Sequence, residues 1–134
     1  MFEITISEAE GRVPVTIMHL KGDLDALGAD VLDAQIEQFN KGQTSDVLVD
    51  MDAVPYMSSA GLRSIHNLFY SLHPEGSDEH KRILDEGVRK GTYKAPHMKL
   101  LNPSKRVREL LEMVGIDMYM EILTGDETTA VNSF

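Results

Sequence analysis

Two kinds of hydrophobic periodicity alternate along this chain, and their order restricts the folds that it can adopt. Apolar and polar residues alternate from Phe2 to Ser7 and from Val13 to Leu20, as in two strands, and the turn around Glu10-Gly11 joins these segments. After residue 20, segments with apolar residues at helical spacing alternate with short apolar segments that are typical of buried strands. The further elements expected are a helix over 26–40, a strand over 47–51, a helix over 61–72, a strand over 98–101, a helix over 103–114, a strand over 118–122 and a short terminal helix. This order predicts an α/β fold with a mixed, mostly parallel sheet of about five strands and about four helices.

Two helix starts can be placed from capping residues. Asn102 and Pro103 are suited to be the N-cap and the first residue of the helix that Gly115 would end. Thr124 and Glu127 have the spacing of a capping box, so the terminal helix is expected to begin there.

The segment 73–96 does not fit the alternating pattern. It is rich in charge, glycine and proline, and it is longer than an ordinary connection between a helix and a strand. We interpret it as a charged insertion in a single domain that spans residues 1–134. Ser77, followed by Asp78 and Glu79, is suited to start a short exposed helix, and disorder is the alternative.

The composition narrows the expected partners and compartment. Basic residues number 13 and acidic residues 22, and the net charge of −9 argues against nucleic acid or an anionic membrane as a partner. The chain has no cysteine, which excludes disulfides and thiolate catalysis and fits a reducing compartment. Because neither an export signal nor a run as long as a membrane span is apparent, we expect a cytoplasmic protein.

The stretch from Val54 to Ser64 joins a predicted buried strand to a predicted amphipathic helix. It places two hydroxyl groups, those of Ser58 and Ser59, after the end of the strand, where α/β folds commonly hold their functional groups. A helix N-terminus offers unpaired N–H groups and the positive end of the peptide dipoles. A serine at this position can therefore cap the helix or carry a phosphate, and the residues alone leave both interpretations open.

Three parts of the chain together resemble the STAS domain of bacterial anti-sigma factor antagonists, which has a SpoIIAA-like fold. They are Gly22-Asp23-Leu24-Asp25, the strand that runs into Val54-Pro55-Tyr56-Met57, and the turn Ser58-Ser59-Ala60-Gly61-Leu62. In such proteins the turn commonly reads Asp-Ser-Ser/Thr/Ala-Gly-Leu, and the serine after its first position is phosphorylated. The resemblance places this phosphorylation at Ser59. Ser58 stands where many members have Asp, and it is the second candidate.

The resemblance implies a binding protein and not an enzyme. The unphosphorylated form would bind an anti-sigma factor that is also a serine kinase, and so release a sigma factor. Phosphorylation would abolish this binding until a serine phosphatase restored it. The alternative is a STAS scaffold subunit of a larger signalling or transport complex that is never phosphorylated. The partner-binding residues implied by the resemblance are Asp23, Asp25, Ser58, Ser59, Ala60, Gly61 and Arg63.

Simpler interpretations exist for three of these side chains. Asp23 and Asp25 follow a strand, where an acidic residue often belongs to a solvated turn or caps a helix. Arg63 lies within the helix after the serine junction, where most arginines are merely exposed to solvent.

No metal site or cofactor is expected from residue spacing. The histidines show neither His-x-x-x-His nor another paired ligand spacing; they are His19, His66, His73, His80 and His97. The run Met57-Ser58-Ser59-Ala60-Gly61 lacks the leading glycine of an esterase nucleophile elbow. If ATP is used, it belongs to the kinase partner.

Overall fold

A five-stranded sheet organises the chain in the computed structural model, which describes residues 1–42, 46–88 and 94–134. The strands lie in sequence order from edge to edge and are β1 (Glu3–Glu10), β2 (Pro14–Lys21), β3 (Val47–Ala53), β4 (Met98–Leu101) and β5 (Glu121–Leu123). β1 and β2 are antiparallel, and each later pair is parallel. The predicted mixed, mostly parallel sheet is confirmed.

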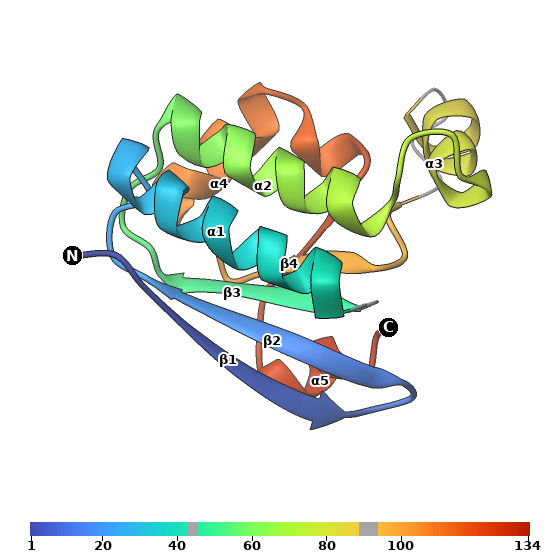
Figure 1. Ribbon diagram of the computed structural model, residues 1–134, viewed down its shortest axis with the longest axis horizontal. Helices are drawn as coiled ribbons and strands as arrows, with labels where there is room; N and C mark the ends of the chain where they lie inside the picture. The colour runs from blue at the N-terminus through green and yellow to red at the C-terminus, as the bar shows by residue number, and fades with distance from the viewer. Residues whose placement is uncertain (43–45, 89–93) are drawn as a thin grey trace.

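Helices cover the two faces of the sheet unequally (Figure 1). One face carries the larger core and three helices, which are α1 (Ala26–Gly42), α2 (Ser59–Leu72) and α4 (Lys105–Met113). The short helix α5 (Glu127–Val131) lies on the other face, over a smaller apolar cluster. In β2, Met18 and Leu20 belong to the larger core and Ile17 to the smaller one, as the two-residue period of a strand requires.

The described residues contain five α-helices, where the sequence predicts about four and leaves a further short helix at Ser77 open. The additional helix, α3 (Asp78–Arg82), lies within the insertion. Among the described helices, none combines the length and the apolar character that a membrane span requires.

The prediction of a strand over 118–122 is wrong for residues 118–120, which do not belong to a strand. Gly115 ends α4 as predicted, with a left-handed φ of 81°, but a 3₁₀-helix (Ile116–Met118) follows it directly. The strand β5 begins only at Glu121. Met118 closes the tight turn and is half-exposed, so its apolar side chain does not mark a strand.

Both predicted helix caps are also wrong. The side-chain amide of Asn102 accepts the backbone N–H of Gly125 at 3.0 Å and donates to its carbonyl at 2.9 Å, so this side chain is not available as a cap. The hydroxyl of Ser104 caps α4 instead. At α5, the cap is Asp126 and not Thr124, because the Asp126 carboxylate accepts a first-turn N–H at 2.6 Å.

In the insertion, the predicted helix start at Ser77 is confirmed. Ser77 Oγ accepts the backbone N–H of His80 at 3.1 Å, and the chain continues beyond α3 as a π-helical segment, η1 (Ile83–Val88). The segment is less exposed than expected, because His80 and the first residue of η1 are buried. The rest of the predicted insertion is described only from residue 94 onward.

His73 follows the end of α2 and lies in the interior. Its ring stacks on that of Phe69, with 4.8 Å between the centroids, and the residue has no exposed surface. Nδ1 donates to the carbonyl of Phe69 at 3.0 Å, and Nε2 accepts the backbone N–H of His97 at 3.2 Å. These partners fit only the neutral ring with its proton on Nδ1. Burial lowers the pKa of His73 to about 4.

This arrangement predicts that the free energy of unfolding decreases as the pH is lowered from 6.5 to about 4. In this range the unfolded chain protonates His73 while the folded chain keeps it neutral, so stability is complete above the unfolded pKa and is lost toward the folded pKa. We expect a loss on the order of 3 kcal/mol, measured by urea unfolding at a series of pH values. In His73→Gln this part of the pH dependence should disappear. An unchanged slope in the variant would refute the assignment.

Candidate functional site

The loops that follow β2 and β3 are joined edge to edge by backbone hydrogen bonds. Leu24 N donates to the carbonyl of Tyr56 at 2.9 Å, and Ser58 N donates to the carbonyl of Leu24 at 3.0 Å. These bonds make Leu24 and Met57 an isolated parallel bridge beyond the ends of the two strands. The bridge brings the predicted site segments, 22–25 and 54–64, together.

Gly61 allows α2 to start directly against this bridge. A Cβ atom at position 61 would lie 2.3 Å from the carbonyl oxygen of Leu24 and 2.8 Å from its Cγ. Because real Cβ atoms do not approach backbone so closely, only glycine fits here without displacing the loop. Gly61 is therefore a packing residue, and it fixes the position of the first turn of α2.

The two adjacent serines occupy different environments. Ser58 is extended, with φ −97° and ψ 177°, and it caps α2: its Oγ accepts the Gly61 N–H at 3.3 Å and donates to the Leu24 carbonyl at 3.4 Å. Ser59 is the first residue of α2, and it is exposed. Within the described part of the chain, the Ser59 hydroxyl has no hydrogen-bond partner. The capping role expected for a serine at this junction thus belongs to Ser58.

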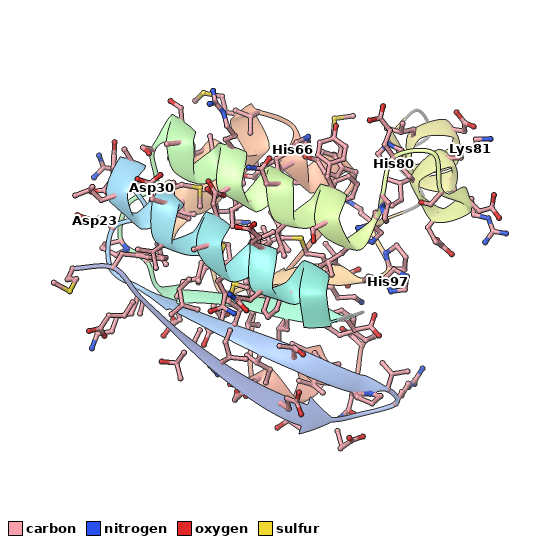
Figure 2. All side chains as sticks on the ribbon, viewed as in Figure 1. Asp23, Asp30, His66, His80, Lys81 and His97 are labelled. Atoms are coloured by element: carbon pink, nitrogen blue, oxygen red, sulfur yellow. The ribbon has the colours of Figure 1, made fainter. Side chains whose placement is uncertain are left out.

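The two acidic residues of the neighbouring loop also differ. Asp25 is half-buried and caps α1, because its Oδ1 accepts the backbone N–H of Gly28 at 3.0 Å. Asp23 is exposed and lies at the end of the molecule where α1 begins (Figure 2). The helix-cap interpretation therefore holds for Asp25, while its contact with a partner stays a prediction.

The first turns of α1 and α2 lie side by side at one edge of the molecule (Figure 1). The buried hydroxyl of Ser64 fixes this arrangement, since it lies 2.8 Å from Asp33 Oδ1 and 3.3 Å from the Ala29 carbonyl oxygen. The sequence analysis did not find this contact, because it joins residues 31 or more positions apart in the chain. The N-terminal ends of two helix dipoles consequently point toward the same edge, which favours negative charge there.

Exposed apolar side chains flank this edge, and the sequence analysis did not identify them. Leu27 is 77% exposed and Val31 is 45% exposed; both line a groove of about 390 Å³ with Asp23 and Asp25. The signal in the sequence is their spacing of four residues on α1, on a side other than that of the buried Leu32. Contiguous exposed apolar surface of this kind is typical of a protein-binding site.

A second groove, of about 260 Å³, lies beside Tyr56, between the serine junction and α4. The guanidinium of Arg106 lies over the Tyr56 ring at 5.3 Å from its centroid. Ala60 is half-buried in the first turn of α2, and Arg63 is exposed one residue beyond that turn. Among the described residues, Arg63 has no ion-pair partner.

Comparison with known proteins now identifies the fold family. The sequence profile of the STAS domain matches residues 7–78, more than half of the 134 residues. This chain belongs to the STAS-domain family. No curated protein matches it in a sequence search.

Solved structures of anti-sigma factor antagonists resemble this STAS domain over nearly their full length. SpoIIAA from Bacillus in its phosphorylated form has 15% identity and a TM-score of 0.66, with 98% of each chain covered. An antagonist from Mycobacterium paratuberculosis has 14% identity and a TM-score of 0.73, covering 99% of this chain and 93% of its own. A third structure, a proposed antagonist from Thermotoga maritima, has 16% identity and a TM-score of 0.71, covering 97% and 92%. At these identities the likeness establishes the SpoIIAA-like fold.

The different environments of the two serines predict different costs of mutation. Ser58→Ala removes the cap of α2 and should lower the free energy of unfolding by about 1 kcal/mol. Ser59→Ala removes only an exposed hydroxyl and should stay within about 0.5 kcal/mol of the wild type. Chemical denaturation of the three proteins at pH 7 measures both. Equal losses, or a larger loss for Ser59→Ala, would contradict the capping assignment.

Proposed function

We propose that this STAS domain is an anti-sigma factor antagonist that works by partner switching. Its unphosphorylated form binds an anti-sigma factor serine kinase and so frees a sigma factor, phosphorylation of Ser59 abolishes the binding, and a serine phosphatase restores it. The chain is then the substrate and ligand of its partners and not a catalyst. The observation that carries the proposal is that Ser58 caps α2 while the Ser59 hydroxyl stays exposed and unengaged.

A kinase needs a serine hydroxyl that it can reach and turn toward ATP. The Ser59 hydroxyl meets this requirement, because it is exposed at the start of a helix whose position is fixed by Gly61. The Ser58 hydroxyl is half-buried between Gly61 N and the Leu24 carbonyl. A phosphate on Ser58 would break the cap and place negative charge beside a carbonyl oxygen, so Ser58 is the poorer acceptor.

The edge that carries Ser59 also suits a switch that leaves the fold intact. A phosphate adds roughly −1.5 to −2 charges, and the free amides of a helix start can stabilise that charge. In the docked complex the same phosphate would have to be desolvated at the edge where α1 and α2 begin. A hundredfold loss of affinity requires about 2.7 kcal/mol, which one buried unpaired charge can supply.

Phosphorylation with a candidate kinase tests the acceptor. The wild type, Ser59→Ala and Ser58→Ala are each incubated with ATP and an anti-sigma factor kinase encoded beside this gene, and added phosphate is mapped by mass spectrometry. We expect one phosphate, at Ser59, in the wild type and in Ser58→Ala, and none in Ser59→Ala. Phosphate at Ser58 would contradict the assignment, and its absence from all three proteins would favour the unphosphorylated STAS scaffold.

Binding to the same anti-sigma factor tests the switch. Ser59→Asp should weaken binding at least tenfold relative to the wild type in calorimetric titrations, because it adds a charge to the docking edge. Thr128→Asp is the matched control, since it adds the same charge at an exposed position of α5 on the other face of the sheet. It should bind as the wild type does. Equal affinity of Ser59→Asp and the wild type would argue against an electrostatic switch at this edge.

A further inference from the structure

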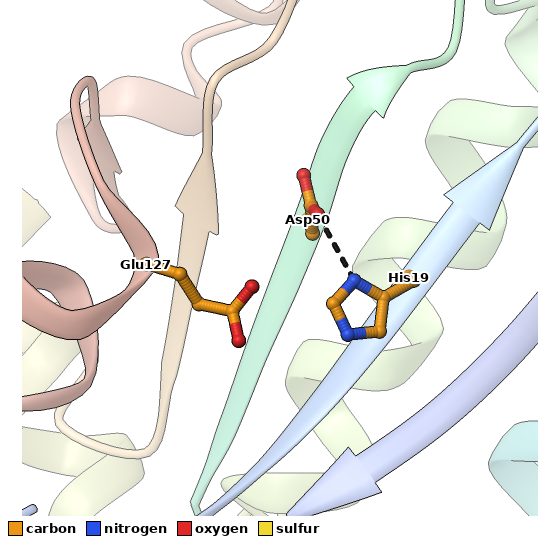
Figure 3. Close-up of side chains that lie close together, drawn as sticks. All are labelled: His19, Asp50 and Glu127. Carbon is orange, nitrogen blue, oxygen red and sulfur yellow. Dashed lines mark hydrogen bonds and ion pairs between the residues drawn. The ribbon is translucent and has the colours of Figure 1, made fainter. Parts of the chain in front are cut away.

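Three potential metal ligands meet on the face of the sheet that α5 covers. His19 comes from β2, Asp50 from β3 and Glu127 from the first turn of α5, and Figure 3 shows their side chains turned toward one another. His19 Nδ1 lies 3.0 Å from Asp50 Oδ2. One ligand atom from each residue can be chosen so that the three lie within 4.8 Å of one another. This cluster is on the opposite side of the sheet from the helices α1 and α2 that carry the proposed switch.

We propose that His19, Asp50 and Glu127 bind one divalent cation of the zinc class, with water completing its coordination. An imidazole nitrogen and two carboxylate oxygens are an established kind of ligand set for Zn²⁺, whereas Mg²⁺ and Ca²⁺ prefer oxygen ligands alone. Two carboxylates and a neutral imidazole also match the charge of a divalent ion. Three protein ligands leave one tetrahedral position to water.

The ligand spacing needs only a small adjustment to hold such an ion. Around Zn²⁺ with bonds of about 2.1 Å, tetrahedral ligand atoms lie roughly 3.4 Å apart. The distance between His19 Nδ1 and Asp50 Oδ2 is already near this value. Only the Glu127 carboxylate has to move closer to these two atoms, and its side chain is exposed and can change rotamer. Glu127 has no hydrogen-bond or ion-pair partner among the described residues, so binding would break no contact of its carboxylate.

Ser7 allows His19 to change from hydrogen bonding to metal binding. Its Oγ lies 3.0 Å from His19 Nε2 on the neighbouring strand. Without metal, a proton on Nδ1 can be donated to Asp50 while Nε2 accepts from the Ser7 hydroxyl. When a cation replaces the proton on Nδ1, the proton moves to Nε2 and Ser7 becomes the acceptor, which a hydroxyl can do equally well. Outer hydrogen bonds of this kind orient histidine ligands in metal sites.

The remaining ligands are held by the fold, and solvent can reach them. Asp50 Oδ1 accepts the Asp52 N–H at 3.1 Å, which leaves Oδ2 directed at His19. The His19 and Asp50 side chains are 31% and 21% exposed, which gives an ion a path of entry. Ala130 and Val131 anchor α5 in the smaller apolar cluster and so keep Glu127 near the strands. A bound cation would tie the start of α5 to β2 and β3.

Zinc titration of the full chain without a histidine tag tests the proposal. We expect calorimetry to show saturable binding of one Zn²⁺ per chain, at least tenfold weaker in Glu127→Gln and in Asp50→Asn, and about 10–100-fold weaker in Ser7→Ala. Glu8→Gln is the matched control, because it makes the same change at an exposed residue that a strand directs to the opposite face from Ser7. It should bind as the wild type does, and Mg²⁺ should not compete.

Cobalt supplies a spectroscopic check on the ligands. Co²⁺ in place of Zn²⁺ should give visible absorption typical of low coordination, and His19→Gln should abolish it while circular dichroism shows the fold unchanged. The proposal is overturned if the wild type shows no saturable binding at about 100 µM Zn²⁺. It is also overturned if Glu127→Gln and His19→Gln bind as tightly as Glu8→Gln, since the ion would then reside elsewhere.

Discussion

The carbonyl of Leu24 is the point on which the candidate site depends. It accepts the backbone N–H of Ser58 at 3.0 Å and the Ser58 hydroxyl at 3.4 Å, and it lies where any Cβ at Gly61 would clash. This one group thus joins the loop after β2 to the loop after β3 and sets where α2 begins. Ser58 is used in this contact, whereas the next residue, Ser59, is exposed. The chemistry proposed for Ser59 follows from that constraint on its neighbour.

The two proposed sites lie on opposite faces of the sheet. At one edge α1 and α2 begin side by side (Figure 1), and the Ser59 and Leu27 side chains in their first turns are exposed. The face under α5 carries the cluster around His19, which borders the smaller apolar core. Helix α3 lies at the opposite ends of α1 and α2 from the serine edge, and its residue His80 is buried (Figures 1 and 2). This placement leaves the serine edge open to a partner.

Hydrophobic periodicity predicted the order of the main strands and helices because it reports directly which face of each element is buried. It failed where a local signal had a partner far away in sequence: Asn102 resembles a cap, but its side chain binds Gly125 in the loop that follows the neighbouring strand β5. The candidate site was assigned from the resemblance to the STAS domain, and the bridge between Leu24 and Met57 brings its two segments together, while the roles of its residues stay predictions. The cluster of His19, Asp50 and Glu127 could not be found by spacing, since only the sheet and α5 bring these residues together.

Ser59 is proposed as a local switch on a fold that does not rearrange, and backbone amide chemical shifts measure whether the fold changes. Two-dimensional NMR spectra are compared for the unmodified protein and the protein phosphorylated at Ser59. We predict that large shift changes are confined to the edge formed by 22–31 and 56–64, because the Leu24 contacts persist and the helix amides stabilise the charge. Large changes throughout β1 to β5 would contradict the local switch, because they would show that phosphorylation alters the fold itself.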